Sequence, residues 1–240
     1  MTELIAENFS NESDFIVLFY NHCQTYEFFI SRLKFTSCIG CEQKEIITEN
    51  SLEAVREIVT YLRNIRVIRN AWLFREEGIA HQGIVSEIVA AIVNGSSRTV
   101  RSILEAGWRL EASQALYNFL SRLKQPLIPI SIQSLVLDNN NDNVTPEVVA
   151  ADVLGLIRED LSERHIKLIG LILHLLDCSM KLSPADELRG HMLPISMLPI
   201  FFNIENYHFM HEWRRILSIF VELIRQAPNV LETGDLDIVF

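Results

Sequence analysis

The stretch that decides the fold is IKLIGLILHLL, residues 166–176, the strongest apolar run in the chain. The apolar period around it predicts a helix over about residues 162–180. A helix that crosses a bilayer needs roughly 20 consecutive apolar residues, and this run is too short and too interrupted to do so. We therefore expect it to be part of a hydrophobic core, and we expect no membrane span.

Apolar residues recur with a helical period along nearly the whole chain. One such pattern predicts an amphipathic helix over about residues 13–34. A second begins near Ser51, a typical helix-capping residue, and extends to Leu62. Further helices are predicted at about residues 84–94, 97–106, 110–123, 146–160, 162–180, 190–202 and 208–226.

No segment shows a convincing strand pattern. Residues 127–132 come nearest, but Pro126 and Pro129 remove two hydrogen-bond donors and favour an extended connector. Clusters of turn-forming residues separate the predicted helices, and no internal repeat of fixed period is present in the sequence. The sequence therefore predicts an all-α fold, built as a single helical bundle.

The composition limits both the number of domains and the class of partner. With 240 residues, 49% of them hydrophobic, the chain is long enough for one good core and too short to demand three domains. A formal charge of −10 argues against nucleic acid and anionic membrane surfaces as main partners, because both require a basic field. Four cysteines, with no apolar targeting segment after Met1, are typical of a reduced cytoplasmic protein.

Two groups of residues are candidate metal ligands. The CxxC at residues 38–41, together with His22 and Cys23, has the chemistry of a zinc site. Reduced thiols are favoured instead, because His22 and Cys23 are adjacent and would face different sides of a helix. His208 and His211 could chelate a metal from one helix face, but a solvated helix start is the better interpretation. We expect no metal, no cofactor and no hydrolase or kinase site, since no nucleophile elbow or glycine-rich phosphate loop is present in the sequence.

Residues 72–78 read WLFREEG, an apolar triplet followed by Arg75, two acids and a glycine. Considered alone, Arg75 would be a surface arginine in a turn. The pattern resembles the first of three blocks in the domain of the Rho GTPase-activating proteins, the RhoGAP family: a glycine, two apolar residues, the arginine finger, two variable residues and a glycine. Arg75 falls on the finger and Gly78 on the closing glycine, whereas Trp72 replaces the first glycine.

The second block of the family is a helix that leads into a proline-containing exit, and residues 116–129 resemble it. The family usually carries a lysine and, four residues later, an arginine that face the GTPase. This chain has Tyr117 and Ser121 at those two positions. Arg122 is adjacent, but on a helix a shift of one residue turns a side chain by about 100°.

The third block of the family places a methionine nine residues before a phenylalanine, with an asparagine between them. Met192 and Phe201 keep this spacing, and Ser196 occupies the place of the asparagine. The resemblance covers about residues 50–232. It implies a RhoGAP-type domain there, an N-terminal helical extension at residues 1–49 and a C-terminal tail at residues 233–240.

The resemblance also implies a function. The chain would be a GTPase-activating protein for a Rho-class small GTPase in its GTP-bound form, with Arg75 inserted in trans as the catalytic arginine finger. Arg75, Gly78 and Arg122 are the expected partner-binding residues. The expected docking surface lies between the 110–123 helix and the 190–204 segment, and the extension before residue 50 is a candidate site for another protein.

Two other functions stay open. Tyr117, Ser121 and Ser196 favour a RhoGAP-like module that binds a GTPase or another protein as a scaffold and activates little. The two acids that follow Arg75 would pair with its guanidinium or repel an acidic partner. The second alternative is a helical scaffold unrelated to GTPases, which would bind a partner helix in an apolar groove.

Overall fold

The computed structural model describes residues 46–64, 80–137, 144–182, 197–202 and 206–231, with only the backbone described at residues 206–213. Within these ranges the chain is mostly helical and has no strand. The predicted all-α class is therefore confirmed for the described part of the chain.

The helices follow one another as several medium-length segments and two long ones. In chain order they are α3 (Glu49–Leu62), α5 (Gln82–Val93), α6 (Ser97–Glu105), α7 (Arg109–Leu120), α8 (Ile130–Leu137), α9 (Pro146–Asp160), α10 (Glu163–Leu182), α12 (Leu198–Phe201) and α13 (Asn206–Val230).

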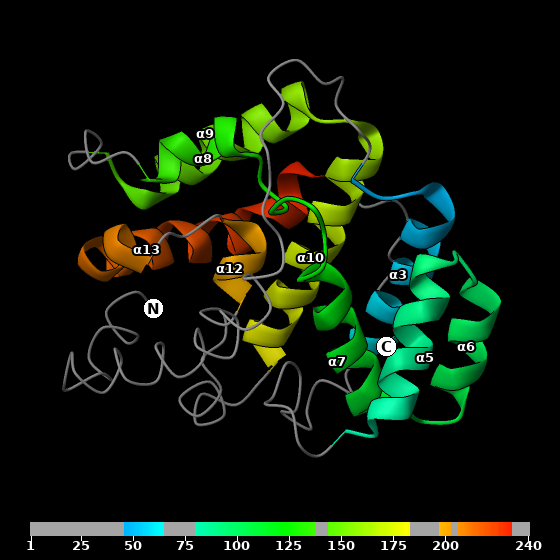
Figure 1. The fold of residues 1–240 in the computed structure, drawn as a ribbon. Helices are drawn as coiled ribbons and strands as arrows, with labels where there is room; N and C mark the ends of the chain where they lie inside the picture. Colours follow the sequence, from blue (N-terminus) through cyan, green and yellow to red (C-terminus); the bar gives the residue numbers. More distant parts are fainter. Residues whose placement is uncertain (1–45, 65–79, 138–143, 183–196, 203–205, 232–240) are drawn as a thin grey trace.

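Helix α10 lies in the middle of the molecule and joins two groups of helices (Figure 1). It packs against α3 on one side and against α13 on the other. In the first group α3 packs on α6, and α5 packs on both α6 and α7. In the second group α8 packs on α9, and α9 lies along α13. The two groups are therefore held in one arrangement through the side chains of α10.

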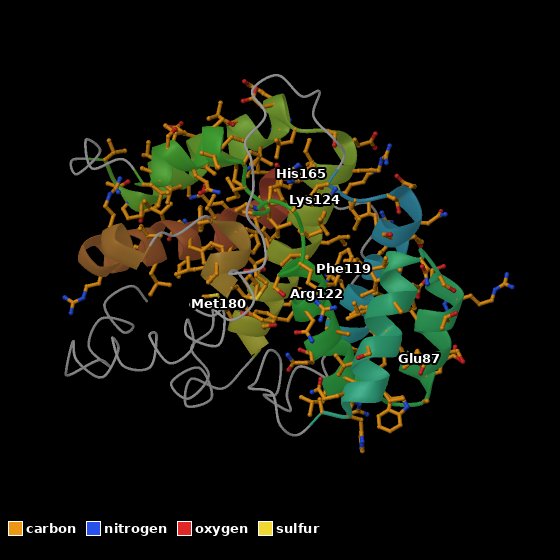
Figure 2. All side chains as sticks on the ribbon, in the orientation of Figure 1. Glu87, Phe119, Arg122, Lys124, His165 and Met180 are labelled. Carbon is orange, nitrogen blue, oxygen red and sulfur yellow. The ribbon has the colours of Figure 1, made fainter. Side chains whose placement is uncertain are left out.

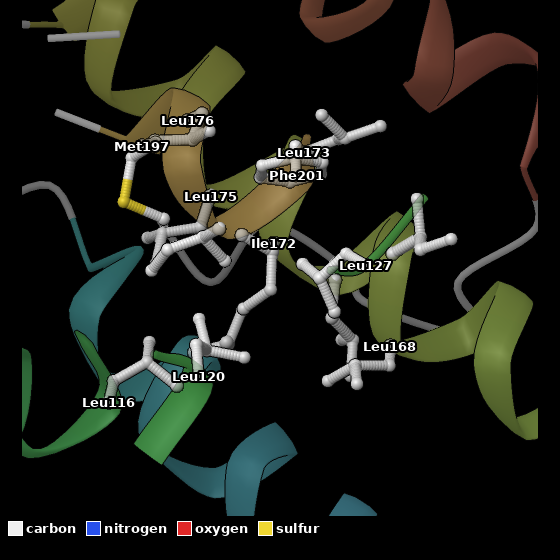
Figure 3. Packing of buried hydrophobic residues seen from close by; sticks show 14 of the residues in the cluster. Leu116, Leu120, Leu127, Leu168, Ile172, Leu173, Leu175, Leu176, Met197 and Phe201 are labelled. Atoms are coloured by element: carbon white, nitrogen blue, oxygen red, sulfur yellow. The ribbon is translucent and has the colours of Figure 1, made fainter. Parts of the chain in front are cut away.

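The hydrophobic core is one continuous cluster that extends from Ile47 to Leu231. Figure 3 shows its centre, where Leu168 and Ile172 of α10 lie among side chains of α7, α12 and the segment between α7 and α8. Both residues are fully buried. Burial of a side chain of this size stabilises a fold by about 1.5–3 kcal/mol. The prediction that the 166–176 run belongs to the core is therefore confirmed.

The predicted start of the first described helix is wrong. Ser51 is not its cap, because α3 begins at Glu49 and its N-cap is Thr48. The Oγ1 atom of Thr48 accepts a hydrogen bond from the Ser51 N–H at 3.2 Å, and the Thr48 hydroxyl also donates to Ser51 Oγ at 2.8 Å. A threonine that pairs with the N–H three residues later satisfies one of the unpaired donors of the first helical turn. Ser51 thus lies inside the helix that it was expected to begin.

The boundaries predicted at residues 84–94, 97–106, 146–160 and 162–180 agree with α5, α6, α9 and α10 to within two residues. Of the helix predicted at residues 190–202 only residues 197–202 are described, where α12 spans Leu198–Phe201, and the helix predicted at residues 208–226 is longer than expected, from Asn206 to Val230. The helix predicted at residues 13–34 lies outside the described residues.

The exit of α7 also differs from the prediction. The helix predicted to extend to residue 123 ends at Leu120. The connector predicted for residues 127–132 is non-helical only as far as Pro129, since α8 begins at Ile130. The Pro129 carbonyl accepts the N–H groups of Ile132 and Gln133 at 2.9 and 3.0 Å, which starts the first turn of α8. A proline suits this position because it has no N–H of its own to satisfy.

Gly95 makes the turn that separates α5 from α6. Its φ angle is +67°, in the left-handed region. The N–H of Gly95 donates to the Ile92 carbonyl at 3.0 Å, and the N–H of Ser96 donates to the Ala91 carbonyl at 2.8 Å. These two bonds are the glycine-dependent helix ending known as the Schellman motif. A Cβ atom built at Gly95 would lie 2.4 Å from the Cβ of Asn50, so the turn packs directly on the first turn of α3.

We expect Gly95→Ala to lower the free energy of unfolding by about 2 kcal/mol or more, because the left-handed backbone alone costs a residue with a Cβ about 1–2 kcal/mol and the new atom would overlap Asn50. Gly83→Ala is the matched control, because nothing lies within 4 Å of a Cβ added there in α5. Denaturant unfolding of both variants measures the difference. Equal stability of the two variants would contradict the role assigned to Gly95.

Candidate functional site

The residues that carry the predicted function are only partly described by the structure. Arg75 and Gly78 lie within residues 65–79, which are outside the described residues. Met192 and Ser196 of the third block lie within residues 183–196, which are also outside them. The described part of the candidate site consists of the two ends that flank residues 65–79, the helix α7 with its exit, and α12.

The first flank is the end of α3, where Arg63 is the C-cap residue. Its Nη2 atom lies 3.2 Å from Nε2 of His174, in the middle of α10. A guanidinium has only donors, so Nε2 accepts and His174 is neutral in this pair. Burial and the neighbouring Arg63 charge lower the pKa of His174, and Asp177 opposes this shift. Arg63 Nε and His174 Nδ1 are buried and have no hydrogen-bond partner among the described residues.

The second flank is held by the first turn of α7. The N–H of His81 donates to Glu111 Oε1 at 3.0 Å, and the His81 ring meets Trp108 edge to face, with 5.3 Å between the ring centroids. Glu111 is only 6% exposed. Its carboxylate is stabilised there because the first turn of a helix presents unpaired N–H groups and a positive partial charge. Glu111 therefore ties the chain that follows residues 65–79 to α7.

Tyr117, in α7, and Ser121, its C-cap residue, are the two positions that the resemblance assigns to a lysine and an arginine of the RhoGAP family. Tyr117 is half-buried and packs against the core, whereas Ser121 is exposed. The Ser121 hydroxyl donates to the Asn118 carbonyl at 3.1 Å. Neither side chain carries a positive charge, so the described face of α7 lacks the cations that those two positions supply in the family.

Two exposed cations follow the end of α7 instead. Arg122 and Lys124, both labelled in Figure 2, are exposed. Within the described part of the chain neither side chain forms an ion pair or hydrogen bond. Because α7 ends at Leu120, Arg122 belongs to a turn in which its N–H donates to the Phe119 carbonyl at 3.1 Å. Ser121, the residue before Arg122, still has a right-handed helical backbone, with φ −67° and ψ −16°, so Arg122 is turned away from Ser121 as successive helical residues are. Whether Arg122 contacts a partner stays a prediction.

The exit of α7 is bonded to α12. The Leu127 N–H donates to the Ile200 carbonyl at 2.9 Å, and the Ile128 N–H donates to the Phe201 carbonyl at 3.1 Å. The structure thus brings together residues of the second and third blocks that are more than 70 positions apart in the sequence. Their side chains are buried on the same core, which includes the predicted core residues Phe201 and Phe202.

The polar residues that organise these junctions were not identified from the sequence. Glu111, Gln133 and His165 are all buried, and each bonds to a backbone group of another element. An acid in the first turn of a predicted helix is a weak signal for Glu111. Gln133 and His165 have no such signal: the partner of His165 is 38 positions away, and the partner of Gln133, the Ile128 carbonyl, lies in the connector just before a helix that the sequence did not predict.

Metal-binding clusters and membrane-spanning helices are both absent from the part of the chain that the structure describes. They contain no group of three or more His, Cys, Asp or Glu side chains arranged to hold a metal ion. Cys178 is a free, half-buried thiol, whereas the CxxC at 38–41 and His22 lie outside the described residues. For His208 and His211 only the backbone is described. Among the described helices, none combines the length and hydropathy of a membrane span.

Comparisons with known proteins found no matching family model, no similar curated protein and no similar solved structure.

We expect Glu111→Ala to lower the free energy of unfolding by about 0.5–1.5 kcal/mol, because the His81 N–H loses its side-chain acceptor. Glu111→Gln keeps an acceptor oxygen at the same place and should cost less. Gln114→Ala is the matched control, since Gln114 is also only 6% exposed on the same helix and, among the described residues, its side chain bonds only to Asn118. Hydrogen exchange of the His81 amide separates the variants: it should accelerate only in Glu111→Ala, and unchanged protection there would contradict the assignment.

We expect His174 to make the stability of the chain decrease in acid. Its folded pKa lies below the ordinary value of 6.5, so the neutral form stabilises the fold fully above pH 6.5. This contribution is lost as the pH falls from 6.5 through the folded pKa. His174→Gln does not titrate and retains an oxygen able to accept from Arg63, so its unfolding free energy should change less between pH 7 and about pH 5. Parallel pH profiles of the two chains would disprove this contribution.

Proposed function

We propose that the chain is a cytoplasmic GTPase-activating module of RhoGAP type, which supplies Arg75 in trans to a GTP-bound Rho-class GTPase. The observation that best supports this proposal is the hydrogen-bonded junction between the exit of α7 and α12. It joins residues of two separate blocks of the resemblance at one place. An accidental resemblance in sequence would give no reason for those blocks to meet.

The first block has a related support. Arg75 precedes His81 by six positions, and His81 is bonded to Glu111 in the first turn of α7. Helix α7 thus holds the segment that follows the proposed finger at its start, and leads to Arg122 and the α12 junction at its end. Helix α7 therefore contacts the first described residues after the first block at one end and leads to the junction between the second and third blocks at its other end.

The chemistry assigned to Arg75 follows from the charge that develops during GTP hydrolysis. Negative charge accumulates on the transferring phosphoryl group and on the leaving oxygen. A guanidinium stays charged at physiological pH and presents a planar fork of donors to phosphate oxygens. Inserted from a second protein, it stabilises this charge and helps to exclude water, which generally accelerates hydrolysis by about 10³ to 10⁵. Gly78 would complete the finger segment, and Arg122 would contact the GTPase.

A binding module with little activation is the second candidate. The observation that favours it is the half-buried position of Tyr117 and the uncharged, exposed Ser121 on α7, where the family presents two cations. A chain that lacks these contacts holds the GTPase less firmly, and a poorly held arginine finger contributes less to the rate. Such a module would still capture the GTP-bound form in preference to the GDP-bound form.

The decisive experiment is single-turnover GTP hydrolysis by a panel of Rho and Rac GTPases with the unchanged chain in excess. We expect acceleration, and we expect Arg75→Ala to remove nearly all of it, about 10³-fold, while leaving binding of the GTP-loaded GTPase within a few-fold. The matched control is Arg98→Ala, which removes an exposed arginine from α6 and should leave the rate unchanged.

The possible results separate the two candidates. Acceleration that survives in Arg75→Ala would assign the catalytic group elsewhere and would exclude the proposed finger. No acceleration, together with capture of only the GTP-loaded form, would establish the binding module instead. Equal capture of the GTP-loaded and GDP-loaded forms, or none, would exclude both.

A further inference from the structure

The segment between α7 and α8 contains two residues whose main-chain polar groups are all bonded to other elements. Leu127 and Ile128 are both fully buried. Their N–H groups donate to the Ile200 and Phe201 carbonyls of α12. Their carbonyl groups accept from side chains: His165 Nε2 lies 2.6 Å from the Leu127 oxygen, and Gln133 Nε2 lies 2.6 Å from the Ile128 oxygen. We call these four hydrogen bonds the connector frame.

The two side-chain donors of the connector frame come from different helices. His165 is in the first turn of α10 and is 5% exposed, and Gln133 is in α8 and is 1% exposed. Since the carbonyls that they bond are out of reach of water, loss of either donor leaves a buried acceptor unpaired. The segment would then move to find another partner. His165 and Gln133 therefore define where the connector lies between α10 and α12.

The connector also carries the two exposed cations. Arg122 and Lys124 precede Leu127 by five and three positions, and no described acidic side chain pairs with either of them. The chain as a whole has a formal charge of −10, so two exposed cations two positions apart in the sequence, with no acidic partner among the described side chains, give this stretch a charge of the opposite sign. Such a stretch is complementary to an acidic partner, and its direction is set by the buried frame immediately after it.

From these observations we infer that His165 and Gln133 are positioning residues, which hold Arg122 and Lys124 in place to bind an acidic surface of the GTP-bound Rho-class GTPase. This inference rests on the proposed function. It assigns to Arg122 and Lys124, in the segment between α7 and α8, the electrostatic contact with the GTPase that the uncharged Tyr117 and Ser121 do not make. The two cations contact the partner, and the two buried side chains act only through them.

The first measurement is the Kd of the full chain for Rho and Rac GTPases loaded with a non-hydrolysable GTP analogue, at several salt concentrations. Salt screens exposed charges, so the affinity should decrease with increasing salt. We expect Arg122→Glu and Lys124→Glu each to raise Kd by about three- to tenfold at low salt and to flatten the salt dependence. Arg98→Glu makes the same charge change on α6 and should affect Kd less than twofold, since α6 lies outside the proposed surface.

The second measurement tests the frame. His165→Ala and Gln133→Met remove one donor each, and we expect each to raise Kd by about fivefold. When either is combined with Arg122→Glu, the effect of Arg122→Glu on Kd should be weaker than in the unchanged chain. His165→Gln places an amide nitrogen where Nε2 lies and should restore the affinity. Ser179→Ala is the matched control: it removes a buried hydrogen bond, from Ser179 Oγ to the Leu175 carbonyl at 2.8 Å, from the same helix α10 without touching the connector.

A merely structural role for His165 and Gln133 predicts a different result. Both variants would then lower the melting temperature but leave the Kd for the GTPase, the salt dependence of Kd and the effect of Arg122→Glu as in the unchanged chain. That result would overturn the inference and leave the proposed function intact. Full affinity in Arg122→Glu and Lys124→Glu would overturn it as well. Failure of the unchanged chain to bind any GTP-loaded GTPase of the panel would overturn the proposed function and this inference together.

Discussion

Burial of the apolar run in α10 is the constraint on which the rest of the described structure depends. Leu168, Ile172 and their neighbours have no contact with water, and they can be covered only from more than one side. Helices α3 and α13 pack against α10 directly, and through them α6 and α9 take their places. Because each buried aliphatic side chain contributes a few kcal/mol, this one helix accounts for a large part of the energy that holds the two groups of helices together.

Hydrogen bonds to buried polar groups fix the relative positions of segments that hydrophobic burial alone does not fix. Apolar side chains pack in many orientations at similar free energy, whereas a buried carbonyl or N–H group needs a partner at a defined distance and angle. Glu111 at the start of α7 and the connector frame at its exit provide such partners. The positions of both ends of α7 are therefore fixed by these hydrogen bonds in addition to hydrophobic packing.

The proposed function makes physical sense of the unusual distribution of charge. A chain with a formal charge of −10 has little general affinity for phosphate, so an arginine that meets GTP must be brought to it by protein contacts. On α7 the expected cations are replaced by Tyr117 and Ser121, and the exposed cations lie after the helix, at Arg122 and Lys124. A GTPase bound through the connector would sit differently from one bound through the helix face, which is a route to selectivity among closely related GTPases.

The apolar pattern of the sequence was enough to predict the helical class and the burial of residues 166–176. It also placed most of the described helices near their observed bounds, because an apolar period of 3.6 residues shows which side of each helix is buried. It misplaced the cap of α3, extended α7 too far and missed α8, since caps and short helices depend on a few local hydrogen bonds rather than on periodicity. For the candidate site the sequence singled out Arg75, Gly78 and Arg122 by resemblance. The roles of Glu111 and His165 around α7 follow from the folded chain alone, because their backbone partners are 30 and 38 positions away, and that of Gln133 depends on a local turn before α8 that periodicity does not report.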